Sequence, residues 1–119
     1  NYPFHRVCGE YISNEVKPFL QHIGCFPKQH NPSSLHWLNV TAPSGFILRS
    51  PLPMGGFGIS RFRLDDFLCQ QAREAGAIVQ EGEQVTSVFQ KDTFFEVHTH
   101  RHQIYKARLV IGAQGKRSV

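Results

Sequence analysis

The C-terminal stretch Ala107-Arg-Leu-Val-Ile-Gly-Ala-Gln-Gly-Lys-Arg-Ser-Val119 decides the fold class. Its run Leu109-Val110-Ile111 is apolar without alternation, which is typical of a strand buried on both faces of a parallel sheet. The run leads into Gly112-Ala113-Gln114-Gly115, where two glycines let the backbone turn tightly and approach a partner closely. Sheets of α/β proteins bind ligands at the carboxyl ends of their strands, so this turn is a candidate ligand site. An ordinary loop after a buried strand is the alternative.

A helix flanked by two short strands is predicted in the middle of the chain. Leu64–Ala75 carries apolar side chains at helical spacing, acidic residues in its first turn and Gly76 directly after it, all of which favour a helix. Ile59–Phe62 and Ala77–Gln80 have the short apolar pattern of strands. A strand, helix and strand in this order form a crossover unit, which implies a parallel pair of strands.

Antiparallel elements are predicted on both sides of this crossover unit. After it come three strands of a meander, at Gln84–Phe89, Phe94–His100 and Ile104–Ile111. Before it, Leu35–Thr41 and Phe46–Arg49 flank the turn-forming run Ala42–Gly45, which predicts a hairpin. Trp37 in this hairpin is expected in the core, with the wall of a pocket as the alternative. The sequence therefore predicts a mixed α/β (α+β) fold.

Two further segments lie outside these elements. A helix is predicted to begin near Lys17, because Pro18 fits only the first turn of a helix. Ser13 or Asn14 can cap its start. Ser50–Gly58 contains two prolines and three glycines, which predict an irregular connector.

The C-terminal stretch resembles the second flavin fingerprint of the para-hydroxybenzoate hydroxylase and geranylgeranyl reductase superfamily, in which a strand ends close to Gly-Ala-Asp-Gly-x-x-Ser. The matching residues are Gly112, Ala113, Gly115, Arg117 and Ser118. Three upstream segments are similar to the same superfamily in the same order, at Arg6–Glu10, Ile59–Asp65 and Ala75–Val79. Together these segments extend over nearly the whole chain.

This resemblance implies an FAD-dependent oxidoreductase, of reductase or monooxygenase type, that acts on an apolar or aromatic small molecule, with NAD(P)H as a candidate reductant. FAD is expected in the full-length protein, and the fragment alone is expected to be inactive. The residues it assigns to the cofactor match the superfamily's motifs: Arg6, Cys8, Gly9, Arg61, Val85, Gly112, Ala113, Gln114 and Gly115. Arg6, Cys8 and Gly9 would face the flavin end of FAD. Gly112–Gly115 would contact the sugar and phosphate end, and the backbone of Val85 would contact the adenine.

Several of these assignments carry an alternative. Cys8 is either at the flavin or a small buried residue in a tight turn, and the side chain of Val85 is a candidate core residue. Arg61 is either a cofactor contact, since its fork suits phosphate and carboxyl groups, or the partner of Asp65 or Asp66. Gln114 stands where the superfamily has an acid, so it can hydrogen-bond a ribose hydroxyl but carries no charge.

The resemblance also implies how the chain is divided. Residues 1–10 and 57–119 would belong to a Rossmann-like FAD-binding domain, and residues 11–56 to the sheet that covers the substrate. The superfamily's opening Gly-x-Gly-x-x-Gly unit does not occur, so the sequence is expected to be an internal fragment. An isolated fragment of this kind is expected to self-associate through unpaired strand edges.

Composition excludes several other classes of protein. The net charge is +4, but the Lys and Arg residues are scattered, which argues against nucleic-acid binding. A non-enzymatic binding module with a basic surface is the alternative function. No apolar run approaches the roughly 18–20 residues of a membrane span. Three cysteines without a CxxC spacing argue against a disulfide framework and a zinc site, and favour the cytoplasm.

Three alternating histidines offer one further chemical possibility. His98, His100 and His102 would share one face of a regular strand, which suits metal chelation. The opposite face, with Phe95 and Val97, is more apolar. We therefore expect the histidines to point to water and to bind no metal.

Overall fold

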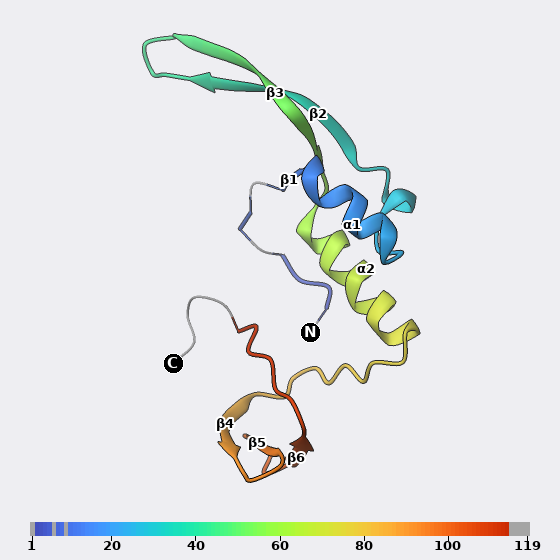
Figure 1. Ribbon diagram of the computed structural model, residues 1–119. Coiled ribbons are helices and arrows are strands. Elements are labelled where there is room, and N and C mark those ends of the chain that lie inside the picture. The colour runs from blue at the N-terminus through green and yellow to red at the C-terminus, as the bar shows by residue number, and fades with distance from the viewer. Residues whose placement is uncertain (1, 6, 9, 115–119) are drawn as a thin grey trace. The chain divides into compact units, whose positions relative to one another are not determined.

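The computed structural model describes residues 2–5, 7–8 and 10–114. The chain divides into two units, Asn1–Val79 and Gln80–Val119. The first unit holds a three-stranded antiparallel sheet in the order β1-β3-β2 together with the helices, and the second holds a three-stranded antiparallel sheet in the order β4-β5-β6 (Figure 1). None of the helices described in these residue ranges is both long and apolar enough to cross a membrane.

The predicted hairpin is confirmed in the first unit. It joins β2 (Ser33–Thr41) to β3 (Ile47–Gly58), and Ala42 N–H donates to the Phe46 carbonyl at 2.9 Å across the turn. Gly45 adopts φ +85° there, a conformation that glycine reaches without the steric cost of a Cβ.

The predicted connector Ser50–Gly58 is wrong, because β3 continues through it. Its last residues pair on both sides, with β1 (Tyr11–Ser13) and with β2. β1 pairs only with Gly56–Gly58 of β3. Pro51 and Pro53 come before this paired segment, on a part of β3 that β1 does not cover. Proline is tolerated at such an edge because no backbone N–H is needed there to bond a neighbouring strand. Trp37 is not in the core, since it is 53% exposed. The Arg49 guanidinium lies over its ring, with Arg49 Cζ 4.4 Å from the centre of the Trp37 ring.

The N-terminal helix begins as the sequence predicts. A 3-10 turn, η1 (Asn14–Val16), leads into α1 (Lys17–His22), with Pro18 in the first turn. The Ser13 hydroxyl accepts from the Glu15 N–H at 3.4 Å, which caps η1. A second 3-10 turn, η2 (Lys28–His30), precedes β2.

Helix α2 (Arg61–Glu74) begins three residues earlier than predicted. The strand predicted at Ile59–Phe62 is therefore wrong: Ser60 is the N-cap, and Arg61 and Phe62 form the first turn. Arg61 and Asp65 form an i,i+4 salt bridge in the first turns, a spacing that brings two side chains together on one face of a helix.

The core of the first unit lies where β3 meets α2. Phe57, Ile59 and Leu64 are buried together, and Phe26 packs edge-to-face on Phe57 at 5.4 Å. Leu20 of α1 and Leu68 of α2 pack against the same cluster.

The predicted meander is confirmed in the second unit. It consists of β4 (Val85–Gln90), β5 (Phe95–Thr99) and β6 (Ile104–Ala107). The strand predicted at Ala77–Gln80 is wrong, as is the buried strand at Leu109–Ile111, whose end residues are 72% and 80% exposed. A strand needs a hydrogen-bonded neighbour, and all strand pairs among the described residues are antiparallel. The mixed α and β class is thus confirmed, without the predicted parallel pair.

Candidate functional site

A pocket of about 680 Å³ lies in the second unit between β4 and the segment that follows β6. Its lining comes from three places in the chain: Gln84–Val88, Val97 and Val110–Gln114. Four residues predicted to bind the cofactor line it together: Val85, Gly112, Ala113 and Gln114. The fold of the second unit therefore brings Val85 together with Gly112–Gln114, although these residues lie far apart in the sequence.

The side chain of Gln114 folds back over Gly112 in this pocket. A Cβ added to Gly112 would lie 2.8 Å from Gln114 Oε1 and 3.4 Å from its Nε2. Glycine at 112 is therefore what leaves room for the amide. An amide can both donate and accept a hydrogen bond, which suits a neutral polar group such as a sugar hydroxyl.

The opposite wall is the irregular start of β4. Val85 pairs with Thr99, but the register shifts before Ser87 pairs with His98, which marks a β-bulge. The Thr86 hydroxyl donates to the His98 carbonyl at 3.2 Å across this bulge. Bulges twist a strand locally and redirect its side chains, and they are common beside binding sites.

Cys8 and Arg61 come together in the first unit. The Arg61 guanidinium donates to both carboxylate oxygens of Asp65, at 2.8 Å from Nε and 2.9 Å from Nη2. This hydrogen-bonded pairing raises the pKa of Arg61, partial burial opposes the rise, and Cys8 adds to it. The Cys8 sulfur in turn accepts from the Glu10 N–H at 3.4 Å. The predicted pairing of Arg61 with an aspartate is confirmed, while its contact with a cofactor stays a prediction.

Glu10 is a residue that sequence reasoning did not single out. Its Oε1 accepts from the backbone N–H of Arg61 at 3.2 Å, and its carbonyl accepts from Ile59 N–H at 3.1 Å. A carboxylate at the first turn of α2 accepts from a backbone N–H that has no partner within the helix. Its negative charge also interacts favourably with the positive end of the helix dipole. Its φ of 56° is a backbone conformation that no sequence pattern around it indicates.

The predicted orientation toward water holds for His100, which is exposed, and is wrong for His98. His100 Nδ1 accepts from the Gln84 N–H at 3.1 Å. His98 packs edge-on against Phe89, and its Nε2 is buried 3.7 Å from a Glu96 carboxylate oxygen. Within the described ranges no three His, Cys, Asp or Glu side chains gather closely enough to hold a metal.

The other predicted contacts either do not line this pocket or lie outside the described residues. Arg6, Gly9 and Gly115 lie outside the described residues. Cys8 and Arg61 belong to the first unit, whereas Val85 and Gly112–Gln114 belong to the second.

Comparison with known proteins adds to the fold. No protein-family model matches the sequence, and no curated protein matches it either. Among solved structures, the chain is similar to the Diels-Alderase PyrE3 of the pyrroindomycin biosynthetic pathway, with a TM-score of 0.77 and 18% identity over 97% of this chain. It is also similar to FqzB, with a TM-score of 0.75 and 22% identity over 99% of this chain. The chain spans only 25% of PyrE3 and 29% of FqzB.

These structures correct the family named from the sequence. Neither is a geranylgeranyl reductase or a para-hydroxybenzoate hydroxylase, so the assignment to that superfamily is wrong. Short glycine motifs recur in many nucleotide-binding proteins, and they therefore indicate a kind of fold better than a family. At these identities the likeness shows the fold alone, which is of the mixed α and β class that the sequence predicts.

Proposed function

We propose that the chain forms part of an FAD-dependent oxidoreductase that acts on an apolar or aromatic small molecule. The observation that carries the proposal is the pocket in the second unit, where Val85 and Gly112–Gln114 face the same space. The adenosine half of FAD would bind there, with the Val85 backbone at the adenine and the Gln114 amide at a ribose hydroxyl. The likeness in fold to PyrE3, an enzyme of a biosynthetic pathway, supports a small-molecule substrate.

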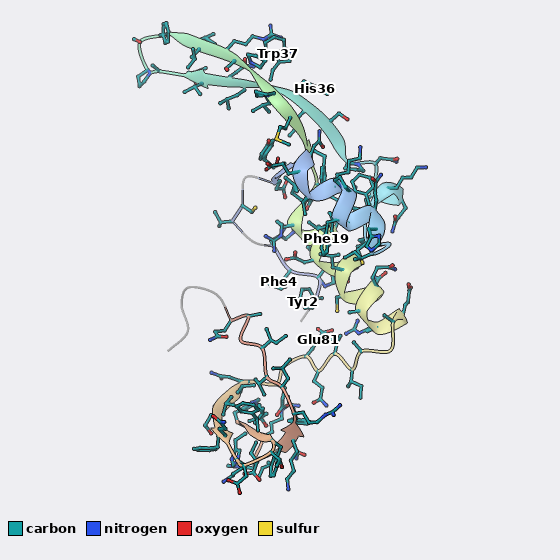
Figure 2. The ribbon with its side chains drawn as sticks, viewed as in Figure 1. Tyr2, Phe4, Phe19, His36, Trp37 and Glu81 are labelled. Atoms are coloured by element: carbon teal, nitrogen blue, oxygen red, sulfur yellow. The ribbon has the colours of Figure 1, made fainter. Side chains whose placement is uncertain are left out.

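The first unit would serve the reactive end of the cofactor and the substrate. Arg61, oriented by Asp65, keeps further N–H donors for a phosphate or a flavin oxygen. Residues 11–56 would cover the substrate, and their hairpin exposes Trp37, whose position on β2 is labelled in Figure 2. An exposed aromatic side chain suits an apolar partner.

The compartment and the reductant are separate questions. Cys8, Cys25 and Cys69 are free thiols, which supports the cytoplasm, because thiols stay reduced there. The described geometry gives no support to NAD(P)H as reductant, so it does not belong to the proposal.

Titration of the ¹⁵N-labelled chain with FAD, ADP and FMN, followed by backbone NMR, tests the proposal. FAD and ADP share the adenosine half, and FMN lacks it. We expect FAD and ADP to shift the amide signals of Val85 and Gly112–Gln114, while FMN leaves these signals in place. Equal shifts with FMN, or shifts confined to surface lysines, would contradict the assignment of the adenosine half to this pocket.

Ionic strength separates this function from a basic binding module. A nucleotide held by backbone groups and a neutral amide loses affinity gradually as salt is added. Binding through a scattered basic surface weakens steeply, because each neutralised charge releases counterions. A steep salt dependence of ADP binding would favour the module with a basic surface.

A further inference from the structure

The wall of the pocket begins with an unusual pair of hydrogen bonds between Gln84 and His100. The Gln84 carbonyl accepts from the His100 N–H at 3.0 Å, as in a regular antiparallel pair. The Gln84 N–H, however, donates to His100 Nδ1 at 3.1 Å. In a regular hydrogen-bonded pair this N–H would donate to the partner's carbonyl. An imidazole therefore replaces a backbone carbonyl in the first rung before β4, and we call this pair the imidazole rung.

The imidazole rung requires one protonation state of His100. A ring nitrogen accepts a hydrogen bond only when it carries no proton, so the ring must be neutral with its proton on Nε2. Protonation makes both ring nitrogens donors. The Gln84 N–H would then face another donor, and the rung would lose its second hydrogen bond.

The residues held by this rung line the pocket. Gln84 and Val85 are consecutive, and both contribute to the wall opposite Gly112. We infer that His100 is a positioning residue, whose neutral imidazole fixes the Gln84–Val85 wall for nucleotide binding, so that binding weakens in acid. This inference rests on the proposed function only for the identity of the ligand, since the rung itself is a feature of the free protein.

The charged neighbours make the expected effect local. Glu83 and Arg101 flank the rung on its two segments and form an ion pair with Nε 3.6 Å from Oε2. The β4–β5 pairing from Val85 to Gln90 does not involve His100, so loss of the rung should not unfold the sheet. His98, beside Glu96, and His102, in the following turn, are the other histidines nearby.

Four variants separate the rung from these neighbours. In His100→Asn the amide oxygen takes the place of Nδ1 as acceptor and does not titrate between pH 5 and 8, roughly the range in which histidines change charge. His100→Gln carries its amide one bond further out, and His100→Ala has no acceptor. His102→Asn is the matched control, because His102 has φ 59°, which Asn tolerates well.

Amide hydrogen exchange of Gln84, measured by NMR from about pH 8 to about pH 5 and corrected for intrinsic rates, tests the rung. In the unsubstituted chain and in His102→Asn we expect the protection of this amide to fall by roughly 2- to 10-fold in acid, as for the loss of one hydrogen bond. His100→Asn should keep its protection throughout. His100→Ala and His100→Gln should lack it even at high pH. An unchanged Gln84 amide in His100→Ala, or a pH dependence that persists in His100→Asn, would overturn the inference.

ADP affinity measured on the same variants links the rung to binding. We expect affinity to fall in acid by a similar roughly 2- to 10-fold factor in the unsubstituted chain and to stay level in His100→Asn. An affinity that ignores pH while the Gln84 amide responds would overturn the role in binding. If ADP shifts no pocket signal at any pH, the proposed function fails, and the exchange data alone decide whether the imidazole rung exists.

Discussion

Replacing Gly112 by Ala tests whether the Gln114 amide is the group that contacts a nucleotide. The three heavy atoms nearest to an added Cβ all belong to the Gln114 side chain, at 2.8, 3.4 and 3.5 Å. The methyl group would therefore displace the end of a flexible side chain and leave the backbone in place. Since a Gly→Ala change without strain also restricts the unfolded chain, we expect stability to stay level or rise by up to about 1 kcal/mol.

The affinity for ADP should respond more strongly than stability. A neutral hydrogen bond contributes about 0.5–1.5 kcal/mol, which corresponds to roughly a 2- to 10-fold weaker Kd when it is lost. Gly112→Ala and Gln114→Ala should each cause a loss of this size. The double variant should bind no more weakly than either single variant, because both changes remove the same contact. Calorimetric titration of the three variants with ADP, beside thermal unfolding, completes the cycle.

Two results would refute this reasoning. If Gln114→Ala binds ADP normally, the amide is not a contact, whatever its position over Gly112. If the losses of the two single variants add in the double variant, Gly112 acts on the ligand through its own backbone, and displacement of Gln114 is not the cause.

Three further outcomes follow from the first unit. Gly56→Ala should lower stability by about 1–3 kcal/mol, since its Cβ would meet the Tyr11 ring and a β1 carbonyl 2.8 Å away. Gly58→Ala is the control and should change stability little, because the nearest atom to its Cβ is 3.5 Å away. Equal urea midpoints for the two variants would contradict this. Asp65→Asn should cost less than about 1 kcal/mol in thermal unfolding, because Arg61 is 34% exposed and solvent screens the pair. The chain should self-associate in light scattering, and a charge at the half-exposed Leu48 should reduce the measured mass; a monomer at all concentrations would count against this.

Elements set by local chemistry could be predicted from the sequence. The hairpin turn at Ala42–Gly45 and the start of α1 at Lys17 depend on residues within a few positions of each other, and both are confirmed. Strand pairing at Gly56–Gly58 could not be predicted, because its partner β1 lies more than forty positions away in the chain. The run Leu109–Ile111 has the composition of a buried strand, but composition does not supply the neighbour that a strand requires.

The candidate site also has one part that could be predicted from the sequence and one part that could not. Glycines and the strand start at Val85 leave a pattern in the sequence, and these residues line one pocket. The imidazole rung leaves none, because a histidine that replaces a backbone carbonyl looks like any other polar residue beside a turn. Alternation predicts that His100 points to water, and the residue is indeed exposed, but alternation does not indicate that its Nδ1 also accepts from a backbone N–H.

Arg61 shows why a structural partner does not decide against a functional role. The sequence posed a choice between pairing with an aspartate and contacting a cofactor, and the pairing with Asp65 is confirmed. A guanidinium on a free side chain loses rotamer entropy when it binds a ligand, whereas one already fixed by a carboxylate has lost much of that freedom on folding. Its remaining N–H donors keep a defined direction, because the fork is planar and rigid. The Asp65 pairing therefore orients Arg61 in advance, and the two roles that the sequence presented as alternatives are compatible.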